Sequence, residues 1–398
     1  MYRSGINQDN AQQMNRELVL RFLRKNKVCS RIELAKLTNL NPATITNIIN
    51  DFQKIGIVEE TGAISEGKGR SAIGLTLSAS KYSVIGIRLA RKYMIIGAFD
   101  IRGEQLKSQE YAFEEWMSPG DVLEAMKMHV HEAINEWISG EVTAIGCAVP
   151  GPFLCKEGRV ALMTGFLAWQ DINIQEELEK EFNLPVFMEN DANAGAIAYY
   201  WKYGTELKQS LVYVAVGQGV GAGVIEDGSL LAGKLGVAGE IGHMSIDYNG
   251  RYCECGSRGC LETYCSTLAF SGEVKRRKAQ GNYSIVKEAD GFKEIVNAVR
   301  VGDRLAVDEY RHACECLTIG IVNIINMLNP DTIVIDDEMV AVEPEMLKNI
   351  LQKGIKQAVL PIVWQELDIV IGDGTQESML QGAAFLAIEE IMKIFARK

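Results

Sequence analysis

The spacing of apolar residues predicts short helices at the start of the chain. Residues 12–27, QQMNRELVLRFLRKNK, place Leu18 and Phe22 on one helical face. The next segment, SRIELAKLT, has Ser30 followed three residues later by Glu33, which is the spacing of a capping box. Both patterns indicate amphipathic helices that follow each other closely.

A third helix follows and ends at a glycine. In NLNPATITNIINDFQKIG, Asn41 is a preferred N-cap residue, Pro42 suits the first helical position, and Gly56 stops the helix. The tripeptide TNL therefore joins two helices into a helix-turn-helix. Residues 57–77 then predict two strands around a basic, glycine-rich turn, which is the shape of a wing.

The outer face of this third helix has the chemistry that reads DNA. Ile45, Ile48 and Ile49 would face the core, which leaves hydrogen-bonding side chains for base edges and phosphates. A helical hairpin used for protein contacts is the alternative, but capping, proline placement, charge and wing together favour DNA. The expected DNA contacts are Asn41, Thr44, Thr46, Asn47 and Asn50 on the helix, and Lys68 and Arg70 on the wing.

Beyond residue 80, apolar runs alternate between strand and helix lengths. This alternation is typical of an α/β body. Strands are predicted at residues 82–90, 93–101, 142–151, 184–190, 210–219 and 331–337, and helices at residues 121–138 and 316–328.

Charge distinguishes the two parts of the chain. The 398 residues are 47% hydrophobic and 23% charged, as in folded soluble proteins, and are too many for one ordinary core. The net charge of −11 argues against a nucleic-acid partner for the chain as a whole. Residues 1–80, however, hold 11 basic against 7 acidic side chains, and the remainder holds 30 against 45. A small basic module therefore precedes a large acidic body.

The sequence predicts a cytoplasmic protein without a membrane partner. The N-terminal MYRSGINQDN lacks the apolar core of a signal peptide, and the longest apolar run, residues 316–328, is too short to span a bilayer. In that compartment the nine cysteines should be thiols or metal ligands, because disulfides do not persist there.

One cysteine group has the spacing of a metal site. Cys253, Cys255 and Cys260 are spaced C-x-C-x4-C among glycines, and His243 lies ten residues before the first of them. Three thiolates and one imidazole complete a tetrahedral zinc shell that leaves no position open for water, which describes a structural site. Free thiols that happen to cluster are the alternative.

Two glutamates flank this loop. Glu240 and Glu262 stand at its ends, where a bound metal would fix their directions. Each carboxylate can accept two hydroxyl hydrogens, so the pair suits a polyhydroxylated ligand better than a solvated surface.

These motifs resemble those of the ROK family of repressors, open reading frames and kinases. GEIGH at 239–243 is similar to its G-E-x-G-H element, and CECGSRGCLE at 253–262 to its zinc loop. The resemblance covers nearly the whole chain, because a winged helix followed by a ROK body is the layout of the family's sugar-responsive regulators. It implies an N-terminal winged helix-turn-helix and a two-lobed, actin-like (ribonuclease H-like) α/β body.

The family fold implies three parts. Residues 1–80 would form the winged helix-turn-helix domain, residues 81–190 the small lobe, and residues 191–375 the large lobe with the zinc loop. A C-terminal helix over about 376–398 would pack back on the small lobe, and the sugar would bind between the lobes.

Two further motifs resemble the sugar-binding half of the family. AVPGP at 148–152 is similar to the sugar-facing loop, and ENDANA at 189–194 to the motif whose aspartate, here Asp191, is the general base of the kinases. The resemblance also places His243 both on zinc and on the sugar. The implied sugar contacts are Gly151, Asn190, Asp191, Glu240, His243 and Glu262.

Two features bear on the identity of the ligand. Phe166 in GFLAW stands where many family regulators have Asn, although Trp169 is kept, which indicates a shifted ligand. Arg88, Arg91 and Lys92 offer the alternative of capturing the phosphate of a sugar phosphate.

The nucleotide-binding half departs from the kinase pattern. RLARK at 88–92 replaces D-x-G-G-T, so side chains occupy a turn where phosphates need bare backbone N–H groups. Asp336, Asp337 and Glu338 stand where a glycine pair is expected, and their charge would repel a nucleotide. VGQGVGAG at 216–223 is kept in part. Asp191 is then a hydrogen-bond acceptor for the ligand rather than a catalytic base.

The sequence therefore predicts a sugar-responsive transcription regulator that is not an enzyme, more often a repressor in this family. Its expected partners are double-stranded operator DNA, a sugar or sugar phosphate and structural Zn²⁺. A homodimer or dimer of dimers would match a palindromic operator. The alternatives are an ATP-dependent sugar kinase with an appended DNA-binding domain, and a docking scaffold without salt-dependent DNA affinity.

Overall fold

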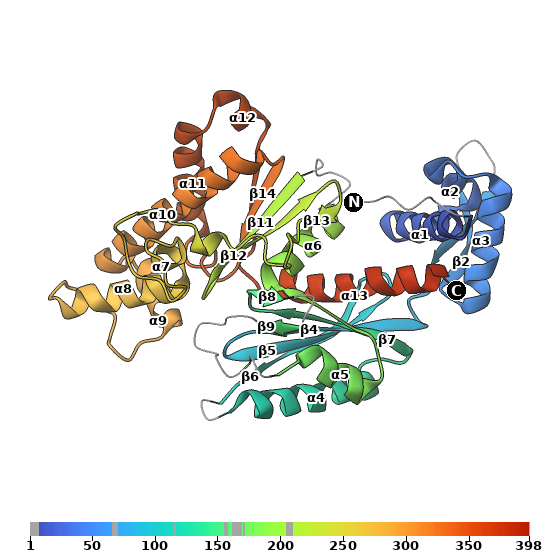
Figure 1. Ribbon diagram of the computed structural model, residues 1–398, viewed down its shortest axis with the longest axis horizontal. Helices are drawn as coiled ribbons and strands as arrows, with labels where there is room; N and C mark the ends of the chain where they lie inside the picture. Colours follow the sequence, from blue (N-terminus) through green and yellow to red (C-terminus); the bar gives the residue numbers. More distant parts are fainter. Residues whose placement is uncertain are drawn as a thin grey trace. The chain divides into compact units, whose positions relative to one another are not determined.

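In the computed structural model (Figure 1), the chain forms two compact units. The first comprises Met1–Cys147, Ile174–Met188 and Ala383–Lys398, and the second Ala148–Asn173 and Glu189–Gly382. Residues 148–173, predicted to belong to the small lobe, therefore group with the second unit. The residues that the structure describes are 8–65, 71–114, 117–154, 158–160, 169, 172–203 and 210–397.

The first unit begins with a winged helix-turn-helix. Its sheet has the order β1-β3-β2, and β2 pairs antiparallel with β3 as a wing does. The turn between these strands, with Lys68 and Arg70, lies outside the described residues. The elements are α1 (Gln8–Asn26), β1 (Cys29–Ser30), α2 (Arg31–Thr38), α3 (Pro42–Ile55), β2 (Val58–Ser65) and β3 (Ser71–Leu77).

The helix boundaries in this module follow local hydrogen-bonding signals. Ser30 and Glu33 form the predicted capping box at the start of α2. Asn41 accepts the backbone N–H of Ala43 at the start of α3, and Gly56 ends that helix with a φ of 77°, a left-handed conformation that glycine adopts without strain. The helix-turn-helix prediction is confirmed.

The rest of the first unit is an α/β layer. Its five-stranded sheet has the order β10-β7-β4-β5-β6. Strand β4 is buried throughout, whereas β6 is an almost wholly exposed edge strand whose polar sequence did not predict it. The elements are β4 (Tyr82–Leu89), β5 (Tyr93–Asp100), β6 (Gln105–Ala112), α4 (Pro119–Glu136), β7 (Glu141–Val149), α5 (Ile174–Phe182), β10 (Val186–Asn190) and the last turns of α13 (Glu377–Arg397).

The second unit repeats this strand order in another sheet, β13-β12-β11-β14-β15. Strand β11 pairs antiparallel with β12 and parallel with β14, which in turn pairs parallel with β15. A short hairpin of β8 (Phe153–Leu154) and β9 (Arg159–Val160) lies outside this sheet. The sheet strands are β11 (Ser210–Val216), β12 (Val220–Glu226), β13 (Ser229–Leu230), β14 (Thr332–Asp336) and β15 (Asp368–Ile371).

Both faces of strand β11 are covered, which explains its unbroken apolar sequence. Val212, Val214 and Val216 belong to the large core with the long helix α10, and alternate residues such as Tyr213 belong to a core with α6 and the start of α13. The helices are α6 (Asp191–Tyr203), the 3₁₀ turn η2 (Ile241–His243), α7 (Glu262–Cys265), α8 (Thr267–Ala279), α9 (Phe292–Arg300), α10 (Arg304–Leu328), α11 (Pro344–Ala358) and α12 (Pro361–Glu366).

The predicted α/β class and the N-terminal winged helix are confirmed. No helix within the described ranges is both long and apolar enough to cross a membrane.

Candidate functional site

Three carboxylates of the second unit lie close enough to influence one another. Asp191 begins α6, Glu240 directly precedes η2, and Glu262 begins α7. Burial, followed by the charges of Asp191 and Glu262, raises the pKa of Glu240 to about 7. No described residue donates a hydrogen bond to the Glu240 carboxylate. This carboxyl group can therefore accept or donate a hydrogen bond near neutral pH.

The loop at Gly151 lies against this cluster. A Cβ atom built on Gly151 would be 3.1 Å from Oε1 of Glu240 and 3.6 Å from Cβ of Asn190. Asn190 is buried, and its Oδ1 accepts the N–H of Asn193 at 2.7 Å. Asn190 thus caps the start of α6, a structural role that the motif alone did not reveal. Phe166 lies outside the described residues, whereas Trp169 is buried.

Glu262 connects the carboxylate cluster to the glycine-rich turn between β11 and β12. Its Oε2 accepts the backbone N–H of Val220 at 3.1 Å, and a Cβ atom on Gly219 would lie 2.9 Å from the same oxygen. Among the described residues, none donates a hydrogen bond to Oε1 of Glu262. One oxygen therefore holds the turn, and the other can serve a ligand.

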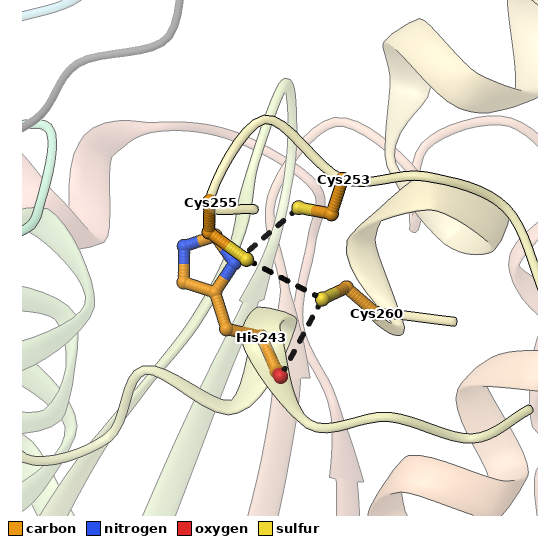
Figure 2. A group of neighbouring side chains, drawn as sticks. All are labelled: His243, Cys253, Cys255 and Cys260. Carbon is orange, nitrogen blue, oxygen red and sulfur yellow. Dashed lines mark hydrogen bonds between the residues drawn. The ribbon is translucent and has the colours of Figure 1, made fainter. Parts of the chain in front are cut away.

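The predicted metal ligands come together in space (Figure 2). The ligand atoms of His243, Cys253, Cys255 and Cys260 all lie within 4.8 Å of one another. Nδ1 of His243 is 3.7 Å from Sγ of Cys253, and the sulfurs of Cys255 and Cys260 are 3.6 Å apart, which excludes a disulfide between them. A tetrahedral zinc ion with bonds of about 2.3 Å to sulfur would separate its ligands by roughly 3.6–3.8 Å. The group could hold a metal ion.

Backbone pairing ties this cluster to the carboxylates. Leu261 donates its N–H to the carbonyl oxygen of Met244 at 2.9 Å, so the residue after Cys260 is held beside the residue after His243. Gly259 has a φ of 71°, and a Cβ atom there would overlap the carbonyl oxygen of Asp247. The loop can close in this way only with glycine at that position.

The carboxylates in the segment that resembles the kinase nucleotide site are held by internal hydrogen bonds and contacts. Asp336, one of the three carboxylates where a glycine pair is expected, is fully buried. Its Oδ1 accepts the N–H groups of Asp337 and Gly374 at 2.9 and 3.0 Å. Its Oδ2 accepts the hydroxyls of Tyr213 and Ser378, both at 3.2 Å. Burial raises the pKa of Asp336, and four donors satisfy its oxygens inside the protein.

Asp337 and Glu338, which follow Asp336, also contact other parts of the second unit. Asp337 has a φ of 86°, the region that favours glycine, and a Cβ atom on Gly217 would overlap its Oδ2. Glu338 accepts hydrogen bonds from Thr267 at 3.2 Å and Gln376 at 3.1 Å. One carboxylate therefore lies against the glycine-rich turn, and the other bridges two segments of the second unit.

In the first unit, RLARK spans the end of β4 and the turn to β5. Arg88 is buried and donates to the hydroxyl of Tyr93 at 2.9 Å. Arg91 is half-buried and Lys92 exposed. The capture of a phosphate by these three cations stays a prediction.

The outer face of α3 is available for DNA. Ile45, Ile48 and Ile49 are buried as expected. The hydroxyl of Thr46 also donates to the carbonyl oxygen of Pro42 at 2.9 Å. Of the predicted contacts, Thr44 is half-buried, and the exposed ones are Asn41, Thr46, Asn47 and Asn50.

Known proteins share both the body and the DNA-binding module. Residues 84–390 match the ROK family model, and residues 15–59 match a winged helix-turn-helix DNA-binding model. The xylose repressor of Caldicellulosiruptor bescii is 30% identical over 96% of this chain and 96% of its own length.

Two solved structures are also similar. A ROK family transcriptional regulator, a homologue of the Escherichia coli Mlc protein, has a TM-score of 0.82 at 28% identity and covers 97% of this chain and 98% of its own. The ROK hexokinase of Thermus thermophilus has a TM-score of 0.64 at 27% identity and covers 78% of this chain and 99% of its own. The regulator thus matches nearly the whole chain, and the hexokinase leaves part of it unmatched.

Proposed function

The chain belongs to the ROK family as one of its DNA-binding transcription regulators, and we propose that a sugar or sugar phosphate controls its operator binding. It represses carbohydrate-utilisation genes until that ligand binds. The observation that carries this proposal is the presence, in one chain, of an exposed polar recognition face on α3 and a cluster of three carboxylates beside a His-Cys₃ group.

The recognition helix reads the major groove. Asn47 and Asn50 present amide groups that can donate to and accept from a base edge, and an Asn that bonds both positions of adenine is a common specific contact. Buried Ile45, Ile48 and Ile49 fix the rotation of α3, so that its polar face points away from the core. Lys68 and Arg70 on the wing add phosphate or minor-groove contacts.

The carboxylate cluster recognises the sugar hydroxyls. Glu240, with its raised pKa, and the second oxygen of Glu262 accept hydrogen bonds from neighbouring hydroxyls, and Asp191 accepts another. Gly151 lies against Glu240 without a side chain that would obstruct the ligand. Asn190 and His243 complete the proposed contacts. The name of the xylose repressor makes D-xylose the first sugar to test.

The His-Cys₃ group fits zinc. Three thiolates and an imidazole are its usual structural ligands, and the two ligand distances in the loop match a tetrahedron. When bound, the ion supplies a structural cross-link. His243 and Cys260 lie next to the segments that carry Glu240 and Glu262. As metal ligands, these two residues keep the two carboxylates at fixed positions relative to each other.

We propose that the body does not transfer phosphate. Asp337 lies against Gly217 and brings negative charge to the turn that would meet a nucleotide's phosphates. Phosphoryl transfer depends on positioning and charge stabilisation, which this carboxylate opposes. The likeness to a hexokinase makes sugar kinase activity the competing function. A coupled ADP-release assay over hexoses, pentoses and amino sugars separates the two, with no release expected.

A homodimer or dimer of dimers is the proposed assembly. One winged helix makes few base contacts, and a two-fold dimer matches a palindromic operator. Sedimentation of the free protein and of its operator complex measures this directly.

The function is tested by fluorescence anisotropy on DNA from upstream of the gene, with scrambled DNA of equal length as control. The double variant Asn47→Ala, Asn50→Ala should lose affinity for this DNA by tenfold or more, since each specific contact contributes roughly 1–3 kcal/mol. Its weak, salt-dependent binding to scrambled DNA should stay the same. Equal loss on both DNAs would contradict the assignment of these residues to base recognition.

A further inference from the structure

A single helix belongs to both units. Helix α13 runs without interruption from Glu377 to Arg397 (Figure 1). The boundary between the units falls within it, between Gly382 and Ala383. Its first turns pack against α6 in the second unit, and its second half reaches Tyr82 and Arg24 in the first unit. The sequence predicted only that this helix packs back on the small lobe.

The first turns of α13 are fitted tightly to α6. Met379 is fully buried in the core that includes Ala192 and Ala196 of α6. A Cβ atom on Gly382 would overlap the carbonyl oxygen of Ala194, so the two helix backbones are in contact there. Because α6 begins at Asp191, a displacement of the ligand-facing end of α6 acts on the start of α13.

The last turns of α13 lead to the end of the recognition helix. The ring of Phe395 lies 4.9 Å from the ring of Tyr82, and the Tyr82 hydroxyl donates to the carbonyl oxygen of Ile55 at 2.8 Å. Lys81 donates to the same oxygen at 2.6 Å. Ile55 is the last residue of α3, where helix carbonyls lack intrahelical donors and a cation is favourable. Tyr82 and Lys81 thus fix the C-terminal end of α3.

Helix α13 also reaches the first helix of the winged module. Glu389 pairs with Arg24 of α1 at 2.8 Å, and the Arg24 side chain is only 13% exposed. The Glu389 side chain is 42% exposed, so solvent screens part of this ion pair.

A third contact leads to the strands of the wing. A Cβ atom on Gly103 would lie 2.8 Å from the ring of Phe385. The neighbouring Arg102 donates to the carbonyl oxygen of Leu77 at 2.9 Å and pairs with Glu59 at 3.2 Å. Helix α13 thus pairs directly with α1, reaches α3 through Tyr82, and reaches the wing strands through Gly103 and Arg102.

We infer that α13 transmits ligand binding from α6 to the recognition helix, with Tyr82 and Lys81 as positioning residues for α3. This relay rests on the proposed sugar-responsive DNA binding. A sugar that binds Asp191 differently in two placements of α6 biases the placement of α13, and the contacts of Phe395 and Glu389 carry the bias to α3 and α1. No ligand contact with the winged helix is required.

Hydrogen exchange tests the relay without any ligand. Phe395→Leu removes the ring that lies against Tyr82 and leaves the sequence of α3 unchanged. We expect amides at the end of α3 to exchange about fivefold faster, the effect of losing one ordinary hydrogen bond. Glu390→Gln is the matched control, since Glu390 pairs with Lys393 on α13 itself. Tyr82→Phe gives the same readout if Phe395→Leu does not fold. Unchanged exchange in a folded variant overturns the relay.

Anisotropy then tests its regulatory consequence. The ratio of operator Kd with and without D-xylose, D-glucose or N-acetylglucosamine is measured for wild type, for Glu389→Gln with Phe395→Leu, and for Glu390→Gln. Allosteric ratios are typically about 5 to 150. The double variant should lower this ratio at least fivefold, and calorimetry should show unchanged sugar affinity without DNA.

The two proposals fail in different ways. A double variant that keeps the full wild-type ratio overturns the relay. A wild-type protein without any sugar effect defeats the proposed function, and hydrogen exchange at the end of α3 still decides whether α13 positions the recognition helix.

Discussion

The second unit holds two groups of carboxylates that differ in how the protein uses them. Asp336 and Glu338 are satisfied from within, by four donors and two donors respectively. Among the described residues none donates a hydrogen bond to Glu240, and burial, followed by its acidic neighbours, raises its pKa. The first pair stabilises the fold. The second group remains in electrostatic conflict, which a ligand with several hydroxyl donors would relieve.

We expect this difference to distinguish a ligand sensor from an enzyme on the shared fold. In the region that resembles the kinase sugar site, the protein keeps acidic groups together at a cost in stability. In the region of the nucleotide elements, acidic side chains have become internal cross-links, and Asp337 lies against the glycine-rich turn. The internal hydrogen bonds of Asp336 and Glu338 thus stabilise the region that resembles the kinase nucleotide site.

Of the changes considered, removal of the metal should lower the sugar affinity most. Cys260→Ser removes one of four ligands, and we expect loss of bound zinc and a fall in sugar affinity of about a hundredfold or more, because the loop ends are no longer cross-linked. Metal analysis and calorimetry measure both. Cys316→Ser, at a buried cysteine outside the cluster, is the control. Sugar affinity that survives complete loss of metal would contradict the cross-linking role.

Replacing one carboxylate of each group by an amide tests whether the first group stabilises the fold and the second binds the sugar. Glu240→Gln should lower sugar affinity about 10- to 100-fold, as expected for hydrogen bonds to a charged group, and should slightly raise the melting temperature by removing repulsion. Glu338→Gln should leave sugar affinity within about twofold and cost roughly 1 kcal/mol of unfolding free energy. Calorimetry and thermal unfolding of both variants give the four values. A reversed pattern would mean that the two roles are assigned the wrong way round.

The substitution Asp337→Gly is expected to change the properties of the protein least. Replacing it by glycine removes a side chain from a left-handed backbone position and should raise the unfolding free energy by up to about 1 kcal/mol. ADP release should stay absent, because RLARK still replaces the first phosphate-binding turn. Chemical denaturation and the coupled assay are the measurements. The appearance of sugar-dependent ADP release would show that this carboxylate alone suppresses a kinase.

Local features were predictable from the sequence because they depend on neighbouring residues. The capping box of Ser30 and Glu33, the N-cap of Asn41 and the stop at Gly56 each involve residues at most three apart or a single backbone conformation. The ligand group of the cysteine loop was also visible, because its spacing among glycines constrains how the loop closes.

Features set by distant residues were not predictable. The inward direction of Asp336 depends on Gly374 and Ser378, which follow it by about forty residues. Strand β6 is polar on both faces, so no alternation marked it, and only pairing with β5 makes it a strand. The contacts of α13 with the winged helix join opposite ends of the chain and leave no local pattern.

The most direct test of the sensor account is operator anisotropy of wild type and Glu240→Gln, each with and without the panel of free and phosphorylated sugars. We predict tight, sequence-dependent binding by both proteins, and one sugar that changes the wild-type Kd at least fivefold but has little effect on Glu240→Gln at the same concentration. Wild-type binding that shows no preference over scrambled DNA, with or without any sugar, would contradict the account.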